Sequence, residues 1–320
     1  MPTNKPIHLL DDFILSLSLD ALPNNQTYTG TIFHYTSLKN INSILFNTDK
    51  TAVLWASRFD CLNDVSEGKV LEKVYTLTCQ KLLEENLISD ETFKLFSSVV
   101  PSRNETYLTP INTGNIKSER LEFDTYIISF SKSRDLLSMW NYYSKGNMYE
   151  GMNIGFDAEA LKKSITEFLP KGKVKCDVCS VIYEQSEQEK FLRDFLLEIN
   201  KKKSCAKSDS VIRATISMKL TSLNMLFKDS HFKHEEEVRV ILKISKKYRN
   251  DFVINYRNYA GLIIPYIPIK VDNTTVSHIT LGPIIGGENQ KQLQKNILHE
   301  MLVANNYQVN EEISSIPVRY

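Results

Sequence analysis

The sequence predicts an α+β fold in which a mixed sheet carries helical insertions, and three observations support this. Short segments with alternating apolar residues, typical of half-buried strands, recur along the chain. Longer segments with helical periodicity lie between them. No internal repeat or low-complexity linker divides the sequence. We therefore expect an N-terminal arm over 1–29 and a single domain over 30–320, with helical insertions near 65–120 and 158–235.

The first expected strand covers 31–35, and Ser37 would cap a helix in which Leu38, Ile41 and Leu45 share one face. Asp64 can cap a second helix, with Glu67 in its first turn. Ser133 or Asp135 can cap a third, over 137–143, and a last helix is expected near 290–303. Further strands are expected at 53–56, 125–131, 151–156, 173–183, 238–244, 252–256 and 276–281.

Composition excludes several classes of protein. The 39 basic and 38 acidic residues nearly cancel, so there is no overall positive field to attract nucleic acid or an anionic membrane. The richest apolar run, 262–269, is far shorter than the ~20 residues of a membrane span, and two prolines interrupt it. The five cysteines have no disulfide-framework spacing, and the first residues do not resemble a signal peptide. We expect a reduced, cytoplasmic protein with no membrane partner.

The strongest local signal is the charge run from Glu235 to Arg239. Strand alternation that buries Val238 must turn Glu235, Glu237 and Arg239 to the other face. Two carboxylates and a guanidinium would then line one polar surface. The alternative is a solvated strand edge with a local ion pair, which has no catalytic meaning.

A second signal is His34 with Tyr35 and Thr36 at the end of the first strand. The imidazole and the phenol can offer hydrogen bonds and a stacking face to a nucleotide, although a histidine in this setting is often purely structural. His231 and His234 lie three residues apart near the glutamates, but a third ligand with suitable spacing is missing. We expect no metal site.

A third signal joins strand-end hydroxyls to aromatic residues on the following helix. Ser129 and Ser131 end the expected strand, and Trp140, Tyr142 and Tyr143 follow. Core packing explains Trp140. It explains two neighbouring tyrosines less well, because one must point elsewhere and can offer its ring to a flat ligand.

Other motifs have structural explanations. Cys176 and Cys179 lack the second pair that a zinc site needs, and a strand is a poor setting for a redox motif, so both should be packing residues. The lysines within 162–175 and 201–207 are expected to be solvated helix surface rather than a basic face for nucleic acid.

In chain order, these motifs resemble a large bacterial family catalogued as a domain of unknown function, over roughly 31–282. That family is distantly similar to ADP-ribosyltransferases, and the resemblance implies a split mixed sheet. The motifs that carry it are Phe33-His34-Tyr35-Thr36-Ser37, Leu54-Trp55-Ala56-Ser57, Asn63-Asp64-x-x-Glu67, Ser129-Phe130-Ser131, Met139-Trp140-x-x-Tyr143, Gly155-Phe156-Asp157 and Glu235-x-Glu237-x-Arg239.

The resemblance implies that NAD is bound as a substrate and that residues of several of these motifs contact it. His34 would hold the adenosine-side ribose. The other implied NAD contacts are Tyr35, Thr36, Ser129, Ser131, Trp140 and Tyr143, with Tyr142 or Tyr143 facing the nicotinamide.

The resemblance further implies that Glu237 is the catalytic carboxylate, which stabilises the positive charge left on the ribose when nicotinamide departs. Glu235 would orient or deprotonate the acceptor, and Arg239 would keep Glu237 ionised or bind a phosphate. The expected arrangement has His34 and Glu237 meeting the same NAD molecule across a cleft, so side chains on opposite sides of the domain would contradict it.

The expected activity is transfer of ADP-ribose from NAD to a macromolecular acceptor, protein or nucleic acid, as in a toxin or an anti-phage effector with a possible antitoxin or regulatory partner. NAD hydrolysis would use the same residues. A non-catalytic nucleotide-binding, nucleic-acid-binding or interaction module is the alternative of a different class.

Overall fold

The computed structural model describes residues 27–62, 69–100, 123–144, 150–206, 208–259, 261–284 and 287–317. Contacts within the chain divide it into two compact units. One consists of Met1–Gln26, Asp64–Glu122 and Ile182–Ser230, and the other of Thr27–Asn63, Phe123–Val181 and His231–Tyr320. All but the last three residues of the expected arm over 1–29 lie outside the described residues. That 30–320 forms one domain stays a prediction.

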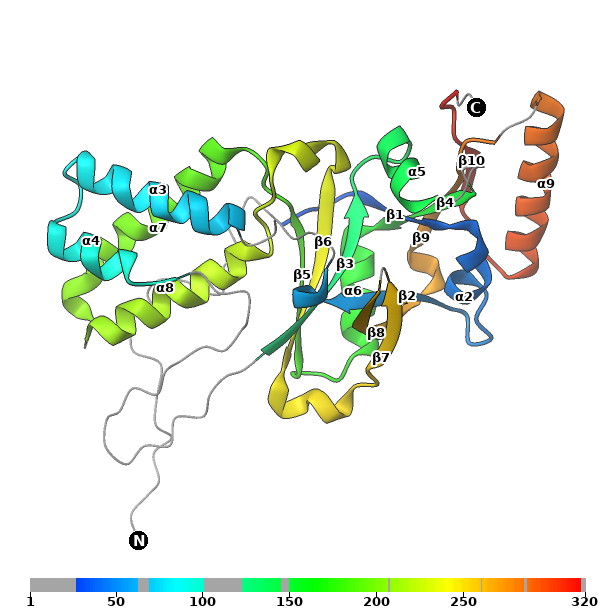
Figure 1. Cartoon of the computed structure of the whole chain (residues 1–320). Coiled ribbons are helices and arrows are strands. Elements are labelled where there is room, and N and C mark those ends of the chain that lie inside the picture. The colour runs from blue at the N-terminus through cyan, green and yellow to red at the C-terminus, as the bar shows by residue number, and fades with distance from the viewer. Residues whose placement is uncertain are drawn as a thin grey trace, which may run out of the picture. The chain divides into compact units, whose positions relative to one another are not determined.

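The first unit, as far as it is described, is helical. Its helices are α3 (Lys69–Glu84), α4 (Asp90–Ser97), α7 (Gln185–Lys202) and α8 (Asp209–Asn224). Helix α3 packs against α7 and α4, and α4 packs against α8 (Figure 1). Each long helix buries an apolar stripe at helical spacing, such as Leu71, Val74 and Leu82 in α3. The expected cap at Asp64 and its partner Glu67 lie outside the described residues.

The second unit is built on a large mixed sheet, which confirms the α+β prediction. Its strand order is β10-β9-β4-β1-β3-β2-β8-β7, while β6 pairs with β3 and β5 (Figure 1). All of these pairs are antiparallel except β10 with β9. The strands are β1 (Thr31–Ser37), β2 (Thr51–Arg58), β3 (Phe123–Ser131), β4 (Gly151–Asp157), β5 (Val174–Ser180), β6 (Glu237–Ser245), β7 (Asn255–Tyr259), β8 (Leu262–Asp272), β9 (Val276–Leu281) and β10 (Asn310–Ile313).

The two edges of β3 are occupied differently. Strand β6 pairs with β3 along its whole length, ending at Ser131 opposite Glu237. On the other edge, β1 pairs only at Ser131, whereas β2 pairs only at Tyr126 and Ile127. Between these contacts, 128–130 have no strand partner on that edge within the described chain. We call this opening between β1 and β2 the fork.

The two faces of the sheet bury different things. The core face packs against α2 (Ile41–Leu45), α6 (Ala158–Phe168) and α9 (Glu288–Ala304). The opposite face, here called the α5 face, carries α5 (Leu137–Tyr143). The apolar residues of the core face include Ile32, Ile128, Phe130, Ile154, Phe156, Val238, Val240 and Ile279. On the α5 face, Met139 and Trp140 pack on Phe33 and Tyr35.

Gly155 in β4 permits the close packing on the α5 face. A Cβ at this position would lie 2.9 Å from Phe33 Cε1 and 2.9 Å from His278 Cβ. Real Cβ contacts are longer than this, so only glycine fits without a shift. This close packing also buries the second face of strand β4. The alternation of apolar residues in 151–156 had predicted a half-buried strand instead.

Strand β8 is the largest element that the sequence analysis missed. Its segment contains Pro265 and Pro268, and proline cannot donate a hydrogen bond to the ladder. Both nevertheless lie within β8, opposite Tyr256 of β7 and Trp55 of β2. In the described part of the chain, no helix has the length and apolarity to cross a membrane.

The expected helix caps in this unit are wrong. The Ser37 side chain makes no capping bond and donates to the Glu150 carbonyl at 3.4 Å instead. Leu136 precedes α5 at the cap position. Asp135 instead accepts from Trp140 Nε1 at 2.7 Å, because the indole N–H is buried and needs an acceptor.

Candidate functional site

The register of β1, β3 and β6 decides which predicted site residues share a face. Ser131 of β3 lies opposite Phe33 of β1 on one side and Glu237 of β6 on the other. Paired residues point to the same face, and the face alternates along each strand. Ser129, Ser131, Tyr35, Glu237 and Arg239 therefore lie on the α5 face.

His34 lies on the other face. It pairs with Ile154 of β4, which belongs to the main core, and its ring meets Phe130 edge-on at 5.6 Å between centroids. The expectation that His34 and Glu237 face one another across a cleft is therefore wrong. The physical reason is the register, which aligns Phe33 and Tyr35, rather than His34, with Ser131 and Glu237.

Glu237 and Arg239 form a buried bidentate ion pair. Arg239 Nε lies 2.8 Å from Glu237 Oε1, and Nη2 lies 3.0 Å from Oε2. The two residues are only 5% and 1% exposed. The prediction that they share a strand face holds, but that face is buried, so the solvated-edge alternative is wrong for this pair. Such two-point pairing fixes both side chains and favours the charged carboxylate.

Glu235 does not share the strand with Glu237, contrary to expectation. It ends the 3₁₀ helix Ser230–Glu235, and Glu236 then turns the chain with a φ of 47°. The strand period therefore starts only at Glu237. Ser131 Oγ donates to the Glu235 carbonyl at 2.8 Å, and Ser133 Oγ donates to Glu236 Oε2 at 2.7 Å. These bonds anchor the entry to β6 on β3, and the Glu235 side chain is half-buried.

The Tyr35 and Ser131 hydroxyls hold the connection between β3 and α5. Tyr35 Oη donates to the Ser133 carbonyl at 2.9 Å and accepts from the Leu136 N–H at 3.1 Å. Burial raises the pKa of this phenol far above its usual range. Ser131 Oγ also accepts from the Ser133 N–H at 3.2 Å. Both hydroxyls therefore hold the scaffold, and their expected role as NAD contacts stays a prediction.

The aromatic residues of α5 divide into one packed and two open side chains. Trp140 is fully buried and meets Tyr35 edge-on at 4.7 Å between ring centroids, so it is a core residue and not a ligand contact. Tyr142 and Tyr143 are both exposed. The Tyr142 hydroxyl lies 3.0 Å from His234 Nε2. Thr36 is buried, and its hydroxyl accepts from Asn40 Nδ2 at 2.9 Å.

The fork holds His34 and Ser129, both half-buried. His34 Nδ1 lies 3.1 Å from the Ser129 carbonyl, on the β3 edge that has no strand partner there. Since a carbonyl only accepts, Nδ1 carries the proton and Nε2 of the neutral ring is an acceptor. Burial lowers the pKa of His34, and the positive charge of Arg257 lowers it further. The imidazole is therefore neutral at pH 7.

Three residues beside the fork were not predicted from the sequence as site residues. Trp55 of β2 stacks on Tyr266 of β8, with ring centroids 4.4 Å apart and an angle of 27° between planes. The Arg257 guanidinium of β7 lies 5.9 Å from the Trp55 ring centroid, and its Nη2 donates to Ser57 Oγ at 3.0 Å. The sequence contained a signal for Trp55. Its neighbours Leu54 and Ala56 are apolar, so strand alternation places Trp55 on the opposite face of the strand from them.

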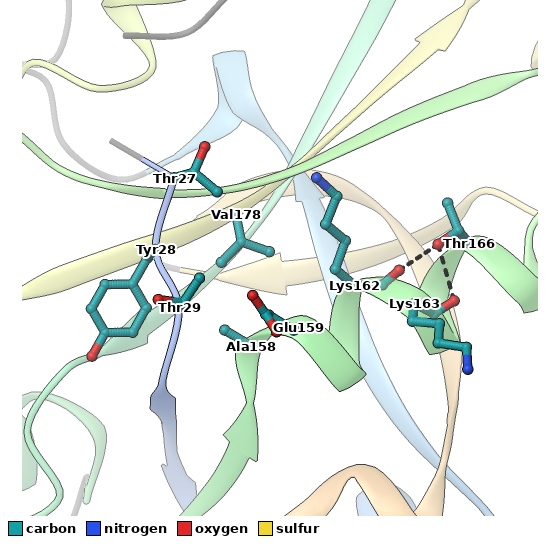
Figure 2. Close-up of a pocket in the computed structure, with 9 residues that line it drawn as sticks. All are labelled: Thr27, Tyr28, Thr29, Ala158, Glu159, Lys162, Lys163, Thr166 and Val178. Carbon is teal, nitrogen blue, oxygen red and sulfur yellow. Dashed lines mark hydrogen bonds between the residues drawn. The ribbon is translucent and has the colours of Figure 1, made fainter. Parts of the chain in front are cut away.

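A separate surface pocket of about 340 Å³ lies where 27–29 pass the N-terminal half of α6 (Figure 2). It contains none of the predicted site residues. Lys162 Nζ lies 3.7 Å from Asp177 Oδ1, and Lys163 Nζ lies 4.0 Å from Glu167 Oε1. These lysines have carboxylate partners on the protein itself, as expected for solvated helix surface, so the pocket receives no function here.

Two features of the described residues bear on metal and thiol chemistry. Within these ranges, no three or more His, Cys, Asp and Glu side chains are grouped as metal ligands. Cys176 and Cys179 are buried and free, and burial raises the pKa of each thiol to about 12. Both are therefore inert packing residues.

Residues 139–240 match the model of a family described as "Protein of unknown function (DUF2971)". The matched segment begins in α5 and ends in β6, so it contains Trp140, Tyr143, Glu237 and Arg239 but not His34. No curated protein matches the chain. The family match agrees with the resemblance to a family of unknown function, and its description states no activity.

Proposed function

We propose that this chain transfers ADP-ribose from NAD to a macromolecular acceptor, and that NAD binds at the fork. The observation that carries the proposal is the order of three neighbouring strands. β1, β3 and β6 lie side by side and bear His34, Ser129 and Glu237, and the resemblance to ADP-ribosyltransferases implies strands with a His, a hydroxyl and a glutamate in this order along the chain. The sheet also divides beside this trio, as a split sheet should.

His34 is suited to holding a ribose. Its Nδ1–H is fixed by the Ser129 carbonyl, so Nε2 has a defined direction and can accept a hydrogen bond from a ribose hydroxyl. Its lowered pKa keeps this acceptor available at neutral pH. The Ser129 hydroxyl lies on the other face of the same opening and can contact the next part of the dinucleotide.

Glu237 would supply the charge that the reaction needs. Departure of nicotinamide leaves an oxocarbenium-like ribose, which a fixed carboxylate stabilises. Arg239 keeps that carboxylate ionised and oriented. Two strand spacings of about 5 Å each separate β1 from β6. We therefore assign the adenosine half of NAD to His34. Because Glu237 lies on the opposite face and is buried, its catalytic role depends on the Glu237→Gln test. Glu235 and Tyr143, both accessible, would meet the acceptor and the nicotinamide side.

The test is incubation of the purified chain with adenylate-labelled NAD, first alone and then with a cell lysate. The proposal predicts label on material that is lost on digestion by either protease or nuclease. His34→Ala should lower kcat/KM for NAD by roughly tenfold or more, because one oriented hydrogen bond is lost. His299→Ala, which removes an exposed histidine of α9, is the matched control and should change nothing.

Each other outcome has a distinct meaning. Rapid release of free ADP-ribose with no acceptor would identify an NAD glycohydrolase instead. No consumption of NAD, together with unchanged cellular toxicity or phage protection for Glu237→Gln, would identify a non-catalytic module. The folded fraction of each variant is measured by circular dichroism at the assay temperature, so that loss of folding is not mistaken for loss of chemistry.

A further inference from the structure

Trp55, Tyr266 and Arg257 form a flat, partly exposed surface on the α5 face, here called the aromatic platform. The register places all three on that face, because Ser57 pairs with Ile127 of β3 and with Tyr266 of β8. Trp55 stacks on buried Tyr266 and yet remains 44% exposed. An indole supported on one side and open to solvent is an unusual use of tryptophan, which normally buries most of its surface.

Arg257 joins the platform to the fork. Its guanidinium lies 5.9 Å from the Trp55 ring, while its charge contributes to the lowered pKa of His34. Nη2 is held by Ser57, and the buried Nε has no hydrogen-bond partner among the residues that the structure describes. The guanidinium is therefore held beside an exposed aromatic ring on the α5 face, whereas His34 lies on the core face. The platform borders the fork, because Ser57 pairs with Ile127, the residue next to the fork.

The aromatic platform suits a ligand that has a planar ring and a negatively charged group close to that ring. Aromatic stacking favours any base, and a fixed guanidinium attracts phosphate and repels cationic ligands. The surface is open, whereas sites for small molecules bury 70–90% or more of the ligand. Stacking of one base on such a surface strengthens binding only about 5- to 150-fold. Stacking of one base is therefore useful chiefly to a polymeric ligand that makes further contacts elsewhere on the protein.

We propose that the aromatic platform stacks a nucleobase of a single-stranded nucleic acid. We further infer that this nucleic acid is the acceptor of ADP-ribose, and this part rests on the proposed function. The binding of the nucleic acid does not depend on the proposed function. With a single arginine at the platform, phosphate contacts contribute little there, so stacking rather than overall charge carries the interaction. The near-neutral net charge of +1 adds no general attraction for nucleic acid, so the platform itself must supply the affinity.

The chain contains its own reporter for this binding. Of its two tryptophans, Trp140 is fully buried, so Trp55 is the one that a ligand can reach. We expect a single-stranded oligonucleotide of about a dozen bases to quench the fluorescence of the full chain without NAD. Trp55→Phe, in which Trp140 is the remaining fluorophore, should show no quenching.

Affinity is measured separately by anisotropy of a labelled oligonucleotide. Trp55→Ala should weaken binding by about 5- to 150-fold, whereas Trp55→Phe, which keeps an aromatic face, should lose much less. Ile263→Ala removes an exposed apolar side chain from the opposite face of the β7–β8 hairpin and is the matched control. It should bind as the unaltered chain does.

Three results would overturn the inference. Equal affinity for Trp55→Ala and the unaltered chain would remove the platform from binding. Equal quenching by AMP or NAD at the same base concentration would assign the platform to a free nucleotide. Equal affinity for double-stranded DNA of the same sequence would indicate backbone electrostatics instead of stacking. Since no arm uses NAD turnover, failure of the proposed transferase activity leaves these outcomes readable.

Discussion

The two faces of the sheet beside β3 differ in how completely their polar groups are used. On the α5 face, the Glu237–Arg239 pair and the Tyr35 and Ser131 hydroxyls all bond within the protein and lie buried. At the fork, His34 uses one ring nitrogen on the Ser129 carbonyl and stays half-buried. Saturated, buried groups point to stability, whereas a partly open, oriented acceptor points to ligand binding. The following predictions test this division.

The largest effect is expected at the buried ion pair. Removing one partner, in Glu237→Gln or Arg239→Met, should lower the free energy of unfolding by about 3–5 kcal/mol, because the remaining charged group stays buried after it loses its two-point ion pair. Denaturant unfolding of both singles and the double variant gives their coupling. Lys270→Ala, which opens an exposed pair with Asp49, should cost about 0–1 kcal/mol. Similar losses for all variants would refute the contrast between buried and exposed pairs.

Packing beneath the α5 face gives the next largest effect. Gly155→Ala should lower the free energy of unfolding by about 1–3 kcal/mol, since the new methyl group meets Phe33 and the His278 Cβ on a fixed backbone. Thermal unfolding measures it. Gly287→Ala is the control, because a Cβ there has no neighbour within 4 Å. A stable Gly155→Ala protein would mean that this face is loosely packed and available to a ligand.

Two serines on one strand separate the buried from the open part of the same face. Ser131→Ala should cost about 1–3 kcal/mol, since the Glu235 carbonyl and the Ser133 N–H both lose a partner. Ser129→Ala should change the free energy of unfolding by less than about 0.5 kcal/mol. Chemical denaturation compares the two. If the order were reversed, Ser129 would be the scaffold residue and Ser131 the candidate for ligand contact.

The smallest effect is a pH dependence at the fork. The unfolded chain protonates His34 below its ordinary pKa of 6.5, whereas the folded protein does so only at lower pH. His34 therefore contributes stability above pH 6.5 that is lost as pH falls toward the lowered pKa. His34→Gln should unfold with a weaker pH dependence between 6.5 and that value. Identical slopes in urea titrations at several pH values would show that the imidazole is not shielded.

Much of the fold was predictable because strand and helix periods are local. Alternation in 125–131 and 238–244 predicted β3 and β6, and helical spacing predicted α9 and the helical insertion near 158–235. Strand β8 was missed because Pro265 and Pro268 break the usual rule for a paired strand, and β10 because four residues are too short for a period. Tertiary pairing overrides both local signals.

The candidate site was less predictable, and the reason is the register. Alternation within one strand predicts that Glu237 and Arg239 share a face, and they do. It does not predict which residue of β1 lies opposite Ser131, and a shift of one residue would exchange His34 for Phe33. Trp140 and Tyr143 illustrate the same limit, because helical spacing alone does not show which aromatic ring another element covers.

The pairing of β6 with β3 has a consequence for biosynthesis. β3 leaves the ribosome long before its full-length partner, because Ser245 must be made before Phe123 can pair with it. Until then the growing chain carries an unpaired strand edge, which favours binding to chaperones or to other nascent chains. Any release of the chain before residue 237 would leave that edge open and omit the catalytic candidate at once. An incomplete product would therefore be prone to aggregate and would lack the glutamate of the proposed activity.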